Sequence, residues 1–298
     1  MNTKTNVTLT AEQQRVMELL QAGRNVFCTG FAGTGKSFLL TEVLNRRSMY
    51  SIHGNTVVTA SSGLAALNIN GQTIHRFAGV GTAEGPAGYV VDAACSDARV
   101  VERWQDCGLL IIDEISMLSG DVLHKIDCTA RACRKRSTES FGGVQVLLLG
   151  DFAQLPPVTR HCAVYDFCFL SPCWGELRLG LVLLTRVFRQ DDDPQFTDIL
   201  AQMRFGRMSP EACAVLRERV QINPNEPTTT MAPTKMCPRN ADVDRENERC
   251  LRTLSGGSQV YASRDTGTDA GALRALQASC PAAASIELKV GAQVVFLF

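Results

Sequence analysis

The sequence predicts an α/β fold in which a parallel sheet is covered by helices on both faces. Strand-like and helical segments alternate along the first half of the chain, and the strand-like segments are apolar at almost every position. Strands of this kind are typical of a parallel sheet buried between two layers of helices. A glycine-rich loop also joins the first strand to the next helix, the context in which such folds bind phosphate.

Each element is expected from its local pattern. A helix begins after Thr10, because Gln13 follows it at the capping-box spacing, and Gly23 ends this helix. Short apolar runs bounded by turn residues predict strands. The expected strands cover residues 25–30, 56–60, 109–114 and 144–150, and further helices cover 36–47, 62–68 and 119–136. Residues 79–104 are rich in glycine and alanine and carry no clear pattern.

The pattern changes after about residue 185, which predicts a second domain. Helical patterns dominate from Pro194 to Val220, and the segment "NPNEPTTT" after them is typical of a connector. The remaining expected elements are a strand near residues 228–232, a helix near 239–254 and strand-forming residues at 286–298. We therefore expect a first domain over residues 1–185 and a second over residues 186–298.

Composition excludes several classes of protein. The chain of 298 residues is 45% hydrophobic and 20% charged, which is ordinary for a globular protein. Its formal net charge is zero, which argues against a histone-like basic surface but is compatible with a basic groove. No apolar run approaches the roughly 20 residues that span a bilayer, and the first ten residues do not resemble a signal peptide. We expect no membrane partner.

The 12 cysteines are typical of an intracellular protein with reduced thiols. Several lie in apolar or helical segments and are expected to be small buried residues. A metal cluster is the alternative for one group only, namely His161, Cys162, Cys168 and Cys173. Their spacing lacks the C-x2-C pair of most zinc sites, so the sequence favours the first interpretation.

A phosphate-binding loop is the strongest motif. The segment "GFAGTGKS" matches the G-x-x-x-x-G-K-S pattern between a strand and a helix. Its glycines let backbone N–H groups surround phosphates, and the N-terminus of the following helix adds positive charge. The lysine would reach the terminal phosphates, and the serine hydroxyl would hold Mg²⁺. The residues expected at this site are Gly30, Gly33, Thr34, Gly35, Lys36 and Ser37.

An acidic pair ends the strand "LLIIDE". Asp113 would help to hold Mg²⁺, and Glu114 would act as the general base toward the attacking water. Together with the phosphate loop, this pair predicts hydrolysis of a nucleoside triphosphate. ATP is favoured over GTP because the chain contains no N-K-x-D sequence of the kind that reads guanine.

A carboxylate and a carboxamide follow the next strand, in "LLLGDFAQLPP". In one interpretation, Asp151 caps a turn and Gln154 faces water. In the other, Gln154 hydrogen-bonds the γ-phosphate or the attacking water, since the carboxyl ends of parallel strands share one edge of the sheet. The preceding motifs favour the second interpretation. The prolines that follow would stiffen the chain and pass on a movement of Gln154.

Several segments occur in a characteristic order. They are "LTAEQ", "TGFAGTGKS", "TASSGLAALNINGQTIHRFAGVG", "LLIIDEISM", "SFGGVQVLLLGDFAQLPPV" and "LTRVFRQ". Over roughly residues 9–254 the chain closely resembles the Pif-one family of superfamily-one DNA helicases. Phe31 stands where this family usually has a small polar residue, and Ser140 stands where it usually has proline.

The resemblance implies a RecA-like ATPase domain over residues 1–185, in which residues 79–104 form a small wedge-like insertion. Residues 186–298 would then be part of a second RecA-like domain, truncated before the SH3-like insertion and the last helicase motifs. The family consists of ATP-driven motors that move 5′ to 3′ on single-stranded DNA. They unwind duplexes, DNA–RNA hybrids and often G-quadruplexes.

The resemblance also implies further site residues. Gln13 matches the glutamine that reads adenine, a role that can coexist with the capping box. Arg189 matches the arginine that reaches the γ-phosphate from the second domain. The residues that match DNA-contacting positions are the hydroxyl residues Thr59, Ser61 and Ser62, and the ring residues His75 and Phe77. A place in the core is the alternative for His75 and Phe77.

Two functions follow as expectations. The first is an ATP-dependent DNA helicase that uses Mg²⁺ and acts as a monomer on single-stranded DNA and on junctions of single and double strands. The second is a nucleotide-gated ATPase that binds single-stranded DNA but unwinds little by itself. Family roles in DNA repair, recombination and telomere maintenance, and a location in the nucleus with the mitochondrion as alternative, are further expectations.

Overall fold

The computed structural model describes most of the chain. The described ranges are residues 8–46, 54–158, 166–190, 192–221, 234–267 and 283–294, with residues 271, 273 and 280. The chain forms two compact units, Met1–Ala214 and Val215–Phe298. The expected domain boundary near residue 185 falls just after the last strand of the first unit, and this unit continues through the next helix.

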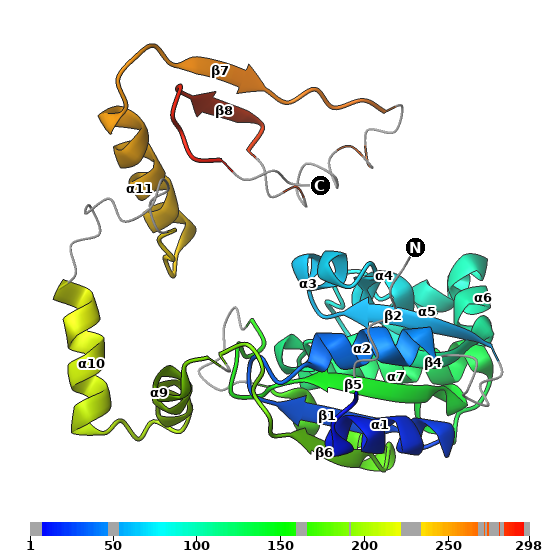
Figure 1. Cartoon of the computed structure of the whole chain (residues 1–298). Coiled ribbons are helices and arrows are strands. Elements are labelled where there is room, and N and C mark those ends of the chain that lie inside the picture. Colours follow the sequence, from blue (N-terminus) through cyan, green and yellow to red (C-terminus); the bar gives the residue numbers. More distant parts are fainter. Residues whose placement is uncertain are drawn as a thin grey trace, which may run out of the picture. The chain divides into compact units, whose positions relative to one another are not determined.

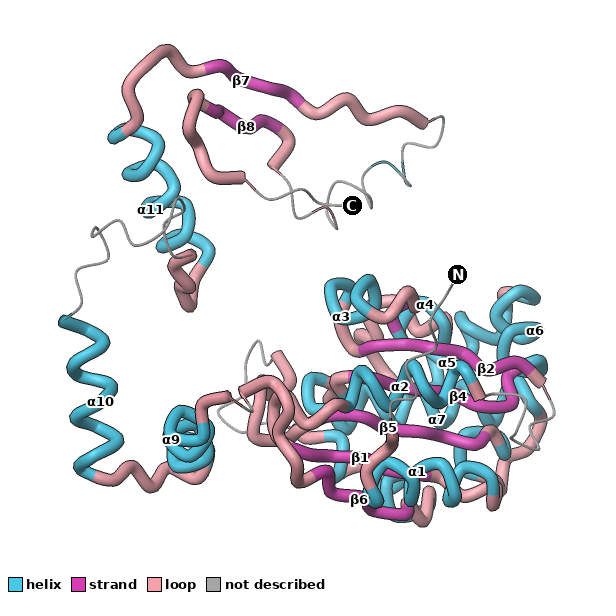
Figure 2. Tube along the Cα trace, viewed as in Figure 1, coloured by secondary structure: helices cyan, strands magenta, loops and turns pink. Residues whose placement is uncertain are grey.

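A six-stranded sheet forms the centre of the first unit (Figures 1 and 2). Its strand order is β3-β2-β4-β5-β1-β6, and all neighbouring strands are parallel. The strands are β1 (Val26–Gly30), β2 (Asn55–Ala60), β3 (Gln72–Thr73), β4 (Cys107–Asp113), β5 (Gln145–Gly150) and β6 (Gly180–Leu184). The predicted α/β fold with a parallel sheet is therefore confirmed.

Helices cover both faces of this sheet, as predicted. One apolar core joins α1 (Ala11–Gln21) and α2 (Lys36–Asn45) to strand residues such as Leu109 and Ile111. The opposite core contains Leu110 and Ile112, because successive side chains of a strand point to opposite faces. The elements around this second core include α4 (Ile74–Ala78), α5 (Ala87–Ser96), α6 (Ala98–Asp106), α7 (Gly120–Arg134) and α8 (Pro172–Glu176).

The segment 79–104, which carries no clear sequence pattern, forms α5 and most of α6 and packs on α7. Its buried side chains Val90, Val100 and Trp104 belong to the core. The Trp104 ring meets the Phe77 ring with centroids 4.8 Å apart in an edge-on arrangement. Val100 and Trp104 lie four residues apart on α6, which is the apolar spacing typical of a helix. Because α6 is short, this pattern is weak in the sequence.

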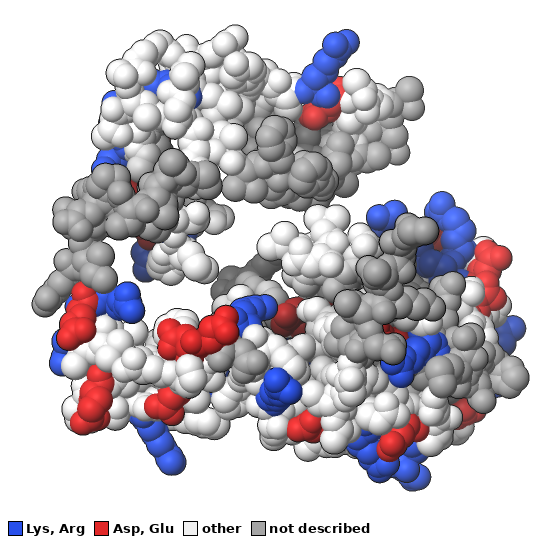
Figure 3. Space-filling view, viewed as in Figure 1, with Lys and Arg blue, Asp and Glu red and all other residues white. Residues whose placement is uncertain are grey.

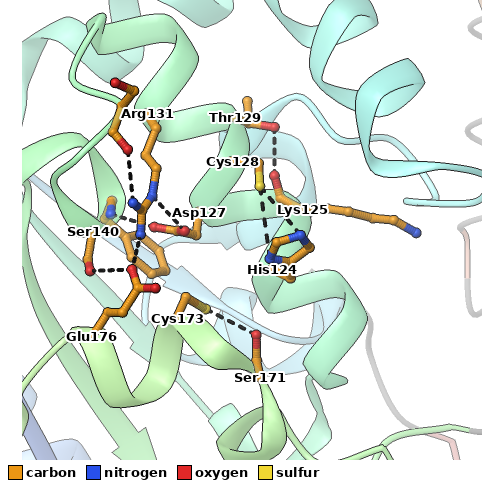
Figure 4. Close-up of polar contacts among 12 residues, drawn as sticks. His124, Lys125, Asp127, Cys128, Thr129, Arg131, Ser140, Ser171, Cys173 and Glu176 are labelled. Carbon is orange, nitrogen blue, oxygen red and sulfur yellow. Dashed lines mark hydrogen bonds and ion pairs between the residues drawn. The ribbon is translucent and has the colours of Figure 1, made fainter.

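A buried ion pair fixes the turn before β5 against α7 (Figure 4). Asp127 accepts a hydrogen bond from Arg131 Nε at 2.8 Å and one from the backbone N–H of Phe141 at 2.6 Å. Arg131 also donates to Glu176 of α8 at 2.5 Å. Phe141 and Gly142 have positive φ angles, and a Cβ on Gly142 would lie 2.7 Å from the carbonyl oxygen of Ala130. The "SFGG" segment is therefore shaped by close packing on α7.

Beyond the sheet, α9 (Pro194–Arg204) belongs to the first unit, and α10 (Pro210–Gln221) spans the division between the units. The second unit contains α11 (Asn240–Thr253) and an antiparallel pair of β7 (Gln259–Ala262) and β8 (Ser285–Leu288). The helices expected after Pro194 and near 239–254 are confirmed. The strand expected near 228–232 lies outside the described residues. The assignment of residues 186–298 to a second RecA-like domain stays a prediction.

The surface of the first unit is that expected of a chain with zero net charge. Basic and acidic side chains are interspersed on the face of the first unit shown in Figure 3.

Within the described ranges, no helix has the length and apolar character to cross a membrane, and no three His, Cys, Asp or Glu side chains gather as metal ligands. Cys168 and Cys173 are buried, whereas His161 and Cys162 lie outside the described residues.

The packing of Phe77 on Trp104 predicts a large contribution to stability. Phe77 is 1% exposed, so Phe77→Ala would leave a cavity and lower the free energy of unfolding by about 3–5 kcal/mol. Denaturation with urea measures this change. Tyr89→Ala on α5, where the side chain is 72% exposed, is the matched control and should change stability by less than about 0.5 kcal/mol. A Phe77→Ala effect as small as the control's would contradict the observed packing.

Candidate active site

Four loops meet at the carboxyl edge of the sheet because the strands are parallel. The loops follow β1, β4, β5 and β6, which lie side by side in the order β4-β5-β1-β6. β1 and β4 end at predicted site residues, and the predicted residues Gln154 and Arg189 lie in the loops that follow β5 and β6. The strand ends are Gly30, Asp113, Gly150 and Leu184. Side chains that are more than a hundred residues apart in sequence are therefore brought to one edge.

The phosphate loop between β1 and α2 has the tight geometry that its glycines predict. Gly33 and Gly35 have φ angles of +80° and +85°, a region that favours glycine. A Cβ on Gly30 would lie 2.6 Å from the carbonyl oxygen of Leu184, so close packing requires glycine there too. Thr34 is buried, and its hydroxyl donates to the carbonyl of Phe31 at 2.8 Å. This hydrogen bond from the buried Thr34 side chain stabilises the conformation of the loop.

Lys36 begins α2 and carries its ammonium group over the loop. Its Nζ donates to the carbonyls of Gly30 and Phe31 at 2.8 and 3.0 Å. Burial lowers the pKa of Lys36, while the charges of Asp151 and Glu114 act in the opposite direction. The ammonium therefore lies among carboxylates at the sheet edge, with donors suited to phosphate oxygens.

Asp113 and Glu114 differ in exposure although they are neighbours. Asp113 is buried, and its Oδ1 accepts the backbone N–H of Glu114 at 2.9 Å. Burial is the main cause that raises the pKa of each carboxyl group, and Asp113 raises that of Glu114 further. Glu114 also has a positive φ angle of +52°, uncommon for a residue other than glycine. A carboxylate of raised pKa is a stronger proton acceptor, which suits a general base.

Gln154 and Asp151 interact directly. Gln154 Nε2 donates to Asp151 Oδ2 at 3.0 Å, and the backbone N–H of Ala153 donates to Asp151 Oδ1 at 3.1 Å. The structure shows the first interpretation, because Asp151 caps the turn and Gln154 is exposed at the sheet edge. A hydrogen bond from Gln154 to the γ-phosphate or the attacking water stays a prediction.

The segment after β6 crosses the phosphate loop and brings Arg189 to it. The backbone N–H of Phe188 donates to the carbonyl of Gly33 at 2.8 Å. A Cβ on Gly33 would lie 2.6 Å from the Cβ of Arg189, which is an exposed residue. The predicted arginine is thus adjacent to the loop within the first unit.

Gln13 forms the predicted capping box and also reaches the phosphate loop. The capping box is present, since Gln13 Oε1 accepts the N–H of Thr10 at 3.1 Å and the Thr10 hydroxyl accepts the N–H of Gln13 at 3.2 Å. The other end of the side chain reaches the phosphate loop, where a Cβ on Gly35 would lie 2.9 Å from Gln13 Nε2. Adenine contact by Gln13 stays a prediction.

The side-chain oxygens at this edge of the sheet are suitable ligands for Mg²⁺. Ser37 is exposed in the first turn of α2, and Asp113 leaves Oδ2 without a hydrogen bond among the described residues. Mg²⁺ prefers few protein oxygens and completes its shell with water and substrate phosphates. A hydroxyl and one carboxylate beside a phosphate loop are such a set.

Two predicted DNA-contacting residues are instead held in the interior. Thr59 is fully buried in β2, and its hydroxyl donates to the carbonyl of Ile111 at 2.7 Å. Phe77 is enclosed by Trp104 and the neighbouring core. The structure therefore favours a structural role for both side chains, because contact with DNA would require β2 or α4 to leave the core.

The other predicted DNA-contacting residues lie nearer the surface. The hydroxyl of Ser61 donates to the backbone carbonyl of Glu114 at 2.8 Å. Ser62 caps α3 (Gly63–Asn68) by accepting the N–H of Ala65 at 3.3 Å. His75 is half-buried on α4, and burial lowers its pKa, which favours the neutral ring. Ser61 thus links this region to the acidic pair.

Arg204, the last residue of α9, is a site residue that no sequence pattern predicted. Its guanidinium pairs with Asp151 and lies over the Phe31 ring, 4.4 Å from the ring centroid. The ring of Phe205 also meets Phe31, with centroids 6.1 Å apart. Phe31, a departure from the usual pattern of its motif, therefore has a packing partner. No local pattern marks Arg204, since its partner is 53 residues earlier in the chain.

Comparison with known proteins gives a consistent result. The PIF1-like helicase family matches residues 8–213. The ATP-dependent DNA helicase PIF1 of Xenopus laevis is 38% identical over 290 residues, which are 97% of this chain and 44% of that protein. The chain thus spans less than half the length of this relative.

Solved structures agree with this match. The Pif1 helicase of Candida albicans is 35% identical, with a TM-score of 0.82, over 96% of this chain and 64% of that chain. The Bacteroides Pif1 helicase in complex with ADP-AlF3 and single-stranded DNA is 28% identical, with a TM-score of 0.72, over 96% of this chain and 65% of that one. Together with the geometry of the sheet edge, these similarities establish that the chain belongs to the PIF1-like helicase family.

Proposed function

We propose that the chain is the ATP-hydrolysing motor portion of a DNA helicase that moves 5′ to 3′ on single-stranded DNA. The observation that carries this proposal is the convergence of four predicted catalytic side chains at one edge of the sheet. They are Lys36, Glu114, Gln154 and Arg189. Duplexes, DNA–RNA hybrids and G-quadruplexes are the proposed substrates for unwinding, in genome maintenance.

Each side chain has a role that its surroundings support. Lys36 would neutralise the terminal phosphates, and Arg189 would stabilise charge on the γ-phosphoryl group as it is transferred. Glu114 would accept the proton of the attacking water, helped by its raised pKa. Mg²⁺, held by Ser37 and Asp113, would polarise the phosphate oxygens when bound.

Two observations support contact with DNA. The solved structure of the Bacteroides Pif1 helicase is a complex with single-stranded DNA. In this chain, the Ser61 hydroxyl joins the end of β2 to the backbone of Glu114. We propose that DNA bound near Ser62 and His75 acts on the position of Glu114 through this hydrogen bond. Action as a monomer, a location in the nucleus, and roles in DNA repair, recombination and telomere maintenance stay predictions from the resemblance.

Unwinding tests the proposed function against the alternative of a DNA-binding ATPase that separates strands poorly. The 298-residue chain is assayed for ATP hydrolysis with and without oligo-dT, and for unwinding of duplexes with a 5′ or a 3′ tail. We expect stimulation by oligo-dT and unwinding of the 5′-tailed duplex only. Stimulated hydrolysis without unwinding would support the alternative, and hydrolysis indifferent to DNA would contradict both functions.

Glu114→Gln tests the assignment of the base. The substitution keeps the shape of the side chain but removes its ability to accept a proton, so kcat should fall by about 10²–10⁴-fold while ATP binding is retained. A steady-state hydrolysis assay and titration with a fluorescent ATP analogue measure the two effects. Glu18→Gln on the exposed face of α1 is the control. Turnover at the wild-type rate in Glu114→Gln would refute the assignment.

A further inference from the structure

Asp151 has an unusually complete set of hydrogen bonds for a carboxylate beside an active site. It is fully buried, and each oxygen accepts two hydrogen bonds. Oδ1 accepts from the N–H of Ala153 at 3.1 Å and from Arg204 Nη2 at 2.6 Å. Oδ2 accepts from Gln154 Nε2 at 3.0 Å and from Arg204 Nη1. With four acceptor positions filled, Asp151 is unsuited to bind a metal or act as a base.

Arg204 is held in place from two sides. Its two terminal nitrogens form a fork on Asp151, the planar geometry that favours arginine over lysine. Its guanidinium also lies over the Phe31 ring of the phosphate loop, 4.4 Å from the centroid. Arg204 therefore connects α9, the phosphate loop and the segment that carries Gln154.

The charge on Asp151 determines how the amide of Gln154 is turned. An ionised carboxylate only accepts hydrogen bonds, so the amide nitrogen of Gln154 must face Asp151. The amide oxygen, Oε1, then faces away from Asp151. An oxygen in this position can accept a hydrogen bond from the attacking water, a contact that an inverted amide would not make.

We propose that Arg204 is a positioning residue for ATP hydrolysis, which orients the Asp151 carboxylate so that Gln154 presents its amide oxygen to the attacking water. This inference rests on the proposed function of the site. It assigns a task in the hydrolytic step to the last residue of α9, which would not touch the reacting atoms.

The electrostatic surroundings support this role. Burial alone would raise the pKa of Asp151, but the hydrogen bonds from Arg204 and Gln154 hold it below its ordinary value. The other charged groups that act on or respond to Asp151 are Lys36 of α2 and Glu114 after β4. Without Arg204, the effect of burial would dominate and the pKa would rise. A protonated Asp151 can donate to Gln154 Oε1, which would invert the amide.

The pH dependence of kcat separates positioning from a merely structural ion pair. Hydrolysis is measured from pH 5 to 9 at saturating ATP and oligo-dT for the wild type, Arg204→Gln and Asp151→Asn. In Arg204→Gln we expect kcat to fall by roughly ten- to a hundredfold, the scale of a misplaced catalytic contact, with KM for ATP changed less than about threefold. Its acid limb should also move to higher pH, since Asp151 would become protonated there.

Asp151→Asn gives a different expected profile. The asparagine does not titrate, and its amide can face Gln154 in either orientation, so kcat should fall at all pH values without a shift of the acid limb. The double variant should be no slower than the slower single variant, because both act through Gln154. Arg207→Ala, an exposed arginine three residues further on, should behave like the wild type.

If Arg204→Gln fails to fold, Arg204→Lys and Gln154→Ala decide the matter. The lysine keeps the charge but loses the fork, and Gln154→Ala leaves the ion pair intact, so each should lower kcat and their combination should not be additive. Wild-type kcat, an unshifted acid limb in Arg204→Gln, or additive effects would overturn the proposal. A wild-type chain without DNA-stimulated hydrolysis would instead refute the proposed function.

Discussion

The parallel pairing of β1 with β5 and β6 fixes where each part of the site lies. Because these strands run in one direction, the phosphate loop, the Gln154 segment and the Arg189 segment all leave the same edge of the sheet. β4 adds the acidic pair on the far side of β5. Two apolar cores, one on each face, hold the strands in this register. An antiparallel insertion of any one strand would send its loop to the opposite edge.

Three carboxylates at this edge acquire different properties from their partners. Asp113 is buried and Glu114 is half-buried, each with few hydrogen-bond donors nearby, and their pKa values are raised. Asp151 is buried more completely, yet Arg204 and Gln154 hold its pKa low. Hydrogen bonding to the charged form thus outweighs burial in one case and not in the others. This difference separates a proton acceptor from a residue that positions its neighbour.

Local sequence patterns predicted the parallel sheet, the phosphate loop and the capping box well, since spacing within a few residues determines each of them. They could not predict contacts between distant segments. Arg204 meets Asp151 and Phe31 only because α9 packs beside two loops. The interior positions of Thr59 and Phe77 depend likewise on Ile111 and Trp104. The sequence of a DNA-contacting motif does not show whether a hydroxyl or ring side chain faces solvent or the core.

We propose that the sheet edge forms a nucleotide-binding site within this chain. Calorimetric titration of the 298-residue chain with a non-hydrolysable ATP analogue and Mg²⁺ tests it most directly. We predict saturable binding of one analogue per chain. Lys36→Ala should bind at least about tenfold more weakly, since it loses charge-assisted hydrogen bonds to phosphate. Absence of saturable binding, or equal affinity in the Lys36→Ala variant, would contradict a nucleotide site at this edge.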